Sequence, residues 1–191
     1  MNVKRQLSNW LLELTNYNTP NIDALPNIDL YMEQMINYLE NELRVFMKNE
    51  NDKIITSSMI NNYVKANIIP APNAKKYRKN HLCNILEICS LKQVLQLSDI
   101  YELLNYDEYK SVFVHYKDQQ DKLIQSIACS TRKELVNVKK ETAEEDLKKL
   151  ATKMAIQANI YKTISERILY LLDMSKQEEI EKIRKLTIKK S

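Results

Sequence analysis

The sequence predicts a mainly all-α protein, and two observations carry this prediction. Apolar residues recur at spacings of three and four along several stretches, which is the repeat of a helix with one apolar face. The four prolines all lie within the first 72 residues, so no proline interrupts a helix in the C-terminal half. Hydrophobic residues make up 44% of the chain and charged residues 28%, which is typical of a folded, soluble protein.

The chain of 191 residues contains no glycine. Walker A loops, dinucleotide-binding fingerprints and nucleophile elbows all require glycine, so we expect no enzymatic activity and no cofactor. The three cysteines, Cys83, Cys89 and Cys129, lack the paired spacing of a zinc site or a disulfide framework. We therefore expect a reduced, cytoplasmic protein without a bound metal.

A first amphipathic helix is predicted near the N-terminus, because Val3, Leu7 and Leu11 follow helical spacing. Glu13 interrupts the apolar positions, so the segment does not resemble a signal peptide. No apolar run in the chain approaches the roughly 18 residues of a membrane span, and we expect no membrane partner. The turn residues of "NTPNIDALPN" follow, and residues 1–24 form an N-terminal helix and linker.

A second helix is predicted over residues 28–47, where the apolar positions keep helical spacing for five turns. The polar sequence "KNENDK" then indicates a loop. The segment that follows, from Lys53 to Leu86, carries six Lys or Arg residues and no Asp or Glu, although the whole chain has a net charge of only +4. A positive charge concentrated in one segment is typical of a polyanion-binding surface.

Within this segment a short helix is predicted, with Thr56 as its N-cap and with Ile60 and Tyr63 on its packing face. The opposite arc of the helix carries four polar residues, Ser58, Asn61, Asn62 and Lys65. Asn pairs with adenine in the major groove, whereas Ser and Lys contact bases or phosphates. These four are candidate DNA-binding residues, although a solvated helix face has the same composition.

We expect the short helix to end at Asn67, because Asn is the residue type after Gly that best adopts a left-handed conformation. Pro70 and Pro72 then exclude a helix, and a short extended excursion follows. It carries five further candidate DNA-binding residues, Lys75, Lys76, Tyr77, Arg78 and Lys79. In a winged helix-turn-helix, such a loop lies over the phosphates next to the recognition helix.

Helices are predicted throughout the rest of the chain. Residues 82–94 form one, and Ser98 is expected to cap a short one. Residues 107–138 and 142–175 are each compatible with a single long helix.

The last of these helices carries an apolar seam from Leu147 to Leu171, which requires a packing partner. Two interpretations remain for that partner, another helix of the same chain or the same helix of a second chain.

The string "TSSMINNYVKANIIPAPNAKKYRKNHLCNIL" resembles the recognition helix and wing of MerR-type transcription regulators. In this match Ile60 takes the place of a buried Leu, Asn67 that of a Gly, and the pair Lys76–Tyr77 that of the basic-Tyr pair of the wing. More closely, "LPNIDLYMEQMINYLE", "MINNYVKANIIPAP" and "LKQVLQLSDI" resemble the bacterial domain of unknown function 1836 family over residues 25–105. The resemblance implies a winged helix-turn-helix and DNA binding, and it names neither an effector nor a target.

We therefore expect three parts: the N-terminal helix and linker, a MerR-like winged helix-turn-helix domain with a small wing over residues 25–106, and a long-helix bundle or coiled-coil region over residues 107–191 for dimerisation or sensing. The expected function is a DNA-binding transcriptional regulator whose partner is double-stranded DNA. The alternative is a helical protein-protein interaction module whose basic segment meets an acidic partner.

Overall fold

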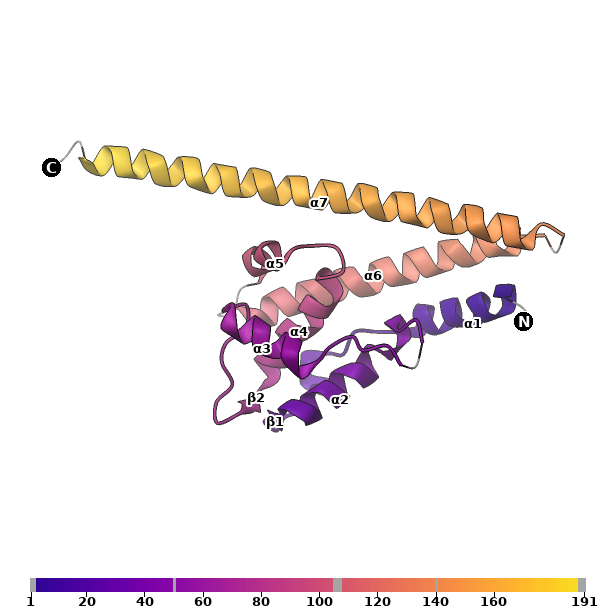
Figure 1. Cartoon of the computed structure of the whole chain (residues 1–191), viewed down its shortest axis with the longest axis horizontal. Helices are drawn as coiled ribbons and strands as arrows, with labels where there is room; N and C mark the ends of the chain where they lie inside the picture. The colour runs from indigo at the N-terminus through magenta and orange to yellow at the C-terminus, as the bar shows by residue number, and fades with distance from the viewer. Residues whose placement is uncertain (1–2, 50, 105–107, 140, 189–191) are drawn as a thin grey trace. The chain divides into compact units, whose positions relative to one another are not determined.

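The computed structural model describes residues 3–49, 51–104, 108–139 and 141–188. This part of the chain contains seven α-helices and one two-stranded sheet (Figure 1), so the prediction of a mainly all-α protein is confirmed. The chain divides into two compact units, residues 1–143 and residues 144–191. In the described ranges, no helix is both long enough and apolar enough to cross a membrane.

The first unit holds six of the helices and both strands. The helices are α1 (Val3–Asn16), α2 (Met32–Glu42), α3 (Ser57–Lys65), α4 (Lys79–Leu91), α5 (Leu97–Leu103) and α6 (Tyr109–Val136). Two short 3-10 turns cover Ile22–Ala24 and Arg44–Phe46. The strands β1 (Leu30–Tyr31) and β2 (Lys76–Tyr77) pair antiparallel, with Leu30 opposite Tyr77 and Tyr31 opposite Lys76.

Helix α4 lies at the centre of this unit, because every residue from His81 to Cys89 is buried. It packs against α6 and α2, and α1 lies alongside α6 (Figure 1). The segment after α1 is fixed to α6 by a buried contact in which the Thr19 backbone N–H donates to Asp121 at 2.9 Å. Lys117 also pairs with Asp121, at 2.8 Å, so the carboxylate is satisfied from two elements.

Several predicted elements differ from the observed ones. The helix expected over residues 28–47 begins only at Met32, because residues 30 and 31 pair with β2 instead, and it ends at Glu42. The short helix near Ser98 begins at Leu97 with Gln96 as its N-cap, so the cap predicted at Ser98 is wrong. Residues 109–136 form one helix, as expected; the domain boundary predicted between 106 and 107 lies outside the described residues.

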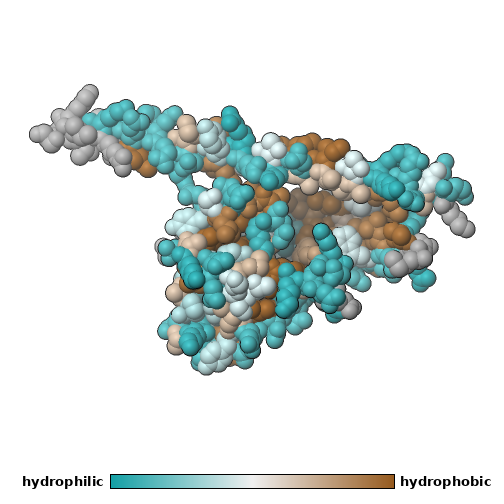
Figure 2. Space-filling model, viewed as in Figure 1, coloured by the Kyte–Doolittle hydropathy of each residue, from teal (hydrophilic) through white to brown (hydrophobic). Residues whose placement is uncertain are grey.

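Helix α7 (Ala143–Ile188) accounts for nearly all of the second unit and is a single helix of 46 residues. It includes the whole predicted seam, of which Tyr161, Ile164, Ile168 and Leu171 are exposed. Figure 2 shows apolar groups interrupting the polar surface of this helix.

Candidate nucleic-acid interface

Helix α3 separates its packing face from its polar face as the sequence predicts. Thr56 is the N-cap, and its Oγ1 accepts a hydrogen bond from the Met59 backbone N–H at 3.3 Å. Ile60 and Tyr63 are buried, which fixes the orientation of the helix. The four polar candidates, Ser58, Asn61, Asn62 and Lys65, are all exposed, and we call them the polar arc.

The chain that enters α3 is anchored to the central helix. The Lys92 Nζ, just past the end of α4, donates to the Ile54 backbone carbonyl at 2.8 Å. Ile55 next to it is fully buried. Because both the entry and the packing face are held, the polar arc is presented by a rigid element.

The end of α3 is a Schellman motif centred on Asn67. The Ile68 backbone N–H donates to the Tyr63 carbonyl at 2.9 Å, and the Asn67 N–H donates to the Val64 carbonyl at 3.0 Å. Asn67 has a φ of 55°, so the predicted left-handed conformation is confirmed. Ile68 and Tyr63 are both buried, which is the apolar contact that accompanies this motif.

A tight turn carries the next basic residues. The Lys76 backbone N–H donates to the Asn73 carbonyl at 2.9 Å, and the two residues between them, Ala74 and Lys75, have φ values of 48° and 61°. Positive φ at both central positions is the pattern of a type I′ turn, which normally contains Gly or Asn. In this chain Ala and Lys occupy it, so the turn is strained and Lys75 is exposed at its tip. We call residues 73–79 the basic turn.

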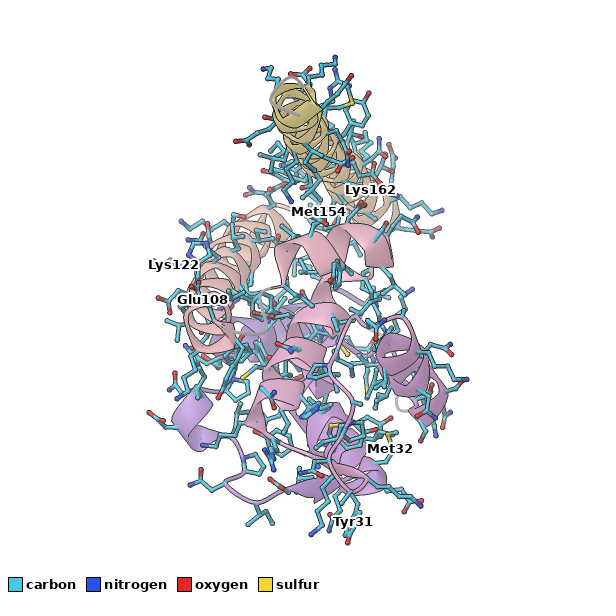
Figure 3. The ribbon with its side chains drawn as sticks, turned by 90° about the vertical axis from the view of Figure 1, so that its left-hand side faces the viewer. Tyr31, Met32, Glu108, Lys122, Met154 and Lys162 are labelled. Carbon is cyan, nitrogen blue, oxygen red and sulfur yellow. The ribbon has the colours of Figure 1, made fainter. Side chains whose placement is uncertain are left out.

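The basic turn is attached to β1 and to the segment before it. Lys76 lies over the ring of Tyr31, with its Nζ 5.5 Å from the ring centroid. Figure 3 shows Tyr31 projecting outward beside Met32, at the start of α2. Arg78 forms an ion pair with Asp29 at 3.5 Å, and the Lys79 Nζ donates to the Ile22 carbonyl at 3.1 Å. Of these three basic residues, Arg78 is the most exposed.

Tyr77 differs from its neighbours, because its side chain is only 3% exposed. Its ring makes an edge-on contact with the His81 ring, at 5.4 Å between centroids. His81 caps the start of α4, where its Nδ1 accepts from the Arg78 backbone N–H at 3.0 Å. Burial lowers the pKa of His81, which favours the neutral ring that this hydrogen bond requires. Tyr77 and His81 therefore hold the basic turn against the core.

The structure thus brings the predicted residues into two groups. The polar arc lies on α3, and Lys75, Lys76 and Arg78 lie on the basic turn, with Lys79 partly occupied in holding the linker. Asp29 and Tyr31, which contact the basic turn from β1 and the residue before it, were not among the predicted site residues. A strand of two residues has no periodic signal, so no pattern could have indicated these contacts.

Across residues 3–49, 51–104, 108–139 and 141–188, no group of three or more His, Cys, Asp or Glu side chains is arranged to hold a metal ion. Cys83 and Cys89 are buried, and Cys129 is exposed.

Comparison with known proteins identifies a family that this chain matches. The model of a family described as "Domain of unknown function (DUF1836)" matches residues 20–125, which is more than half of the chain. The matched segment contains α2 to α5 and both strands, and therefore the polar arc and the basic turn. No curated protein and no solved structure matches the chain.

Proposed function

This chain belongs to the DUF1836 family, and we propose that it is a transcriptional regulator. In this proposal the matched segment, residues 20–125, is a MerR-like winged helix-turn-helix that binds double-stranded DNA. In this proposal α3 enters the major groove and the basic turn is the wing. The observation that carries it is the division of one acid-free segment into an exposed polar helix face and an exposed, strained basic turn.

The polar arc supports the role given to α3. The major groove of B-DNA is about 12 Å wide and accepts one α-helix. Asn61 and Asn62 are exposed and carry both a donor and an acceptor, which is what the adenine edge requires. Ser58 and Lys65 complete the arc and suit contacts with bases or backbone. Since Ile60 and Tyr63 hold the other face in the core, the arc is the face left for a ligand.

The basic turn supports the role given to the wing. Strained backbone in a structure is a reason to look for function, and here the strain places Lys75 at the tip. Lys76 and Arg78 lie within the same turn, and Asp29 neutralises part of the Arg78 charge in the absence of DNA. We propose that phosphates replace Asp29 as the partner of Arg78. Tyr77 is left out of the phosphate contacts because its ring is buried, and its role is to support the turn.

We also propose a homodimer through the seam of α7. The exposed seam residues lie on one continuous helix, and helix-turn-helix proteins commonly bind paired half-sites as dimers. Leaving large apolar side chains in water is unfavourable, so a second copy of α7 is a suitable partner.

The first experiment measures DNA affinity as a function of salt by fluorescence anisotropy with a duplex of random sequence. Each phosphate contact contributes a slope of about −0.9 in log K against log salt. The double variant Lys76→Gln/Arg78→Gln should weaken binding to every sequence alike and reduce the slope by about two units. The control Lys110→Gln/Lys122→Gln removes the same charge from exposed positions of α6, and it should leave the slope unchanged; Lys122 is labelled in Figure 3.

The second experiment separates base contacts from phosphate contacts. A preferred duplex is first selected from a random pool, and Asn61→Ala is then compared with the unmodified protein on that duplex and on random DNA. We expect a loss of roughly 1–3 kcal/mol on the selected duplex only, with the salt slope intact. An equal loss on both duplexes would contradict a base contact by Asn61.

The salt titration also tests the alternative function. If the double variant of the basic turn binds DNA with unchanged affinity at low salt, the basic turn does not contact phosphates. A protein partner with an acidic surface would then be the better explanation for the six basic residues between Lys53 and Leu86.

A further inference from the structure

A cavity of about 560 Å³, partly open at the surface of the first unit, lies between α4, α5 and α6. Most of its lining is aliphatic, and Leu14 of α1 and Phe46 close further sides. The volume is within the range of about 300–1,000 Å³ in which small-molecule sites usually occur. The residues described so far as candidate DNA contacts do not line it.

One acidic side chain faces this apolar space. Glu87 is the only Asp or Glu among the lining residues, and the lining includes no Lys or Arg. The residue is 2% exposed, and its Oε1 is buried without a hydrogen-bond partner in the described part of the chain. Burial raises the pKa of Glu87 to about 8. An unsatisfied buried carboxyl group is unfavourable for folding, so its position at a cavity suggests that a ligand satisfies it.

Two of the other polar side chains of the lining, Tyr116 and Gln120, already have hydrogen-bond partners. The Tyr116 hydroxyl donates to Gln120 Oε1, and Gln120 Nε2 donates to the Thr19 hydroxyl at 3.0 Å. These contacts use both ends of the Gln120 amide. Glu87 therefore differs from Tyr116 and Gln120, because its buried Oε1 has no hydrogen-bond partner in the described part of the chain.

We propose that this cavity binds a small, mainly apolar organic molecule that carries one protonated amine, with the ammonium N–H donating to the carboxylate of Glu87. The apolar lining selects the body of the molecule, because burying it removes apolar surface from water. The charge of the amine is selected because the lining supplies a carboxyl group and no cation. The proposal goes beyond DNA binding and does not depend on it.

Binding should be coupled to the release of a proton. The other titratable groups that interact with Glu87 are Cys83 on α4 and Tyr116 on α6, and burial raises the pKa of both above the neutral range. His115 also lines the cavity, at an exposed position. At pH 7 Glu87 is mostly protonated in the empty protein, whereas a bound ammonium favours the carboxylate. Close to one proton should therefore leave Glu87 for each amine that binds.

The test uses the full chain and a matched pair of rigid probes, adamantan-1-amine and adamantan-1-ol, in isothermal titration calorimetry at pH 7. The amine is expected to bind at least tenfold more tightly than the alcohol. Titrations in buffers with different ionisation enthalpies should show the release of close to one proton for the amine and none for the alcohol. The proton count separates the contact with Glu87 from simple apolar binding.

The variant Glu87→Gln keeps the shape of the side chain and removes its charge. It should abolish both the preference for the amine and the proton release, and it should retain binding of the alcohol, which shows that the cavity is still formed. The control Gln119→Glu places a carboxyl group at an exposed lining position and should not restore the preference in Glu87→Gln. Equal affinity for the two probes, an unchanged preference in Glu87→Gln, or no binding of either probe at millimolar concentration would each overturn the proposal.

Discussion

The left-handed residue at the end of α3 allows a sharp test of the local structure. Asn67 has a φ of 55°. This left-handed conformation costs a residue with a side chain about 1–2 kcal/mol. The cost is at the lower end of this range for Asn and at the upper end for β-branched residues. Asn67→Val should therefore lower the free energy of unfolding by about 1 kcal/mol, which is the difference between the two penalties. Asn67→Gly should leave it unchanged or raise it by up to about 1 kcal/mol, because Gly has no such penalty.

The assay is urea unfolding followed by the fluorescence of Trp10, the only tryptophan of the chain. It reports on the first unit, since its Nε1 donates to the Val45 carbonyl at 2.9 Å. With a typical dependence of about 2 kcal/mol per molar urea, Asn67→Val should move the midpoint down by about 0.5 M.

Asn62 is the matched control, because it is exposed and lies inside α3. Gly is less favourable than Asn in a helix interior, so Asn62→Gly should destabilise the protein where Asn67→Gly does not. If the Gly and Val variants at residue 67 have the same midpoint, the reasoning from φ is wrong.

Ala74, Glu87 and the seam of α7 can each be tested by substitution. Ala74→Gly, in the tip of the basic turn, should raise the free energy of unfolding by about 0.5–1 kcal/mol in the same urea assay, because Ala74 has a φ of 48°; a loss of stability would contradict the turn assignment. The pKa of Glu87 is raised from 4.5 to about 8 in the folded state, so the unfolded chain releases its proton first and stability falls as pH rises from about 4.5 to 8. Unfolding at pH 5 and pH 8 should show Glu87→Gln gaining on the order of 4 kcal/mol relative to the unmodified protein over this interval, and a constant difference would refute the shift. For the proposed dimer, sedimentation at micromolar concentration should give twice the chain mass of 22.6 kDa. Ile168→Asp in the seam should give a monomer, whereas Tyr170→Asp, equally exposed at 53% but off the seam, should not.

The parts of the fold that depend on neighbours in sequence could be predicted. The cap at Thr56, the burial of Ile60 and Tyr63 and the left-handed Asn67 all follow from interactions within a few residues. Residues 109–136 likewise form one helix because nothing in their sequence interrupts it.

The parts that depend on distant segments could not be predicted. Residues 30 and 31 lie within the helix predicted over residues 28–47, but pairing with β2 makes them a strand. The same pairing places Tyr77 in the core although basic residues surround it in sequence. Glu87 stands out in "HLCNILEICSL" as one acidic residue among apolar ones, yet only the packing of α5 and α6 around α4 shows that it faces a cavity.

The burial of α4 on all sides restricts how this unit could change shape. The helix starts directly after Arg78 in the basic turn and carries Glu87 about two turns further on, a rise of roughly 12 Å. Between them no face is free, so the helix cannot rotate or slide by one residue without inserting His81 or Asn84 among apolar neighbours. A displacement of α4 at the cavity would therefore move the whole helix. Glu87 and the basic turn would be expected to move together or not at all.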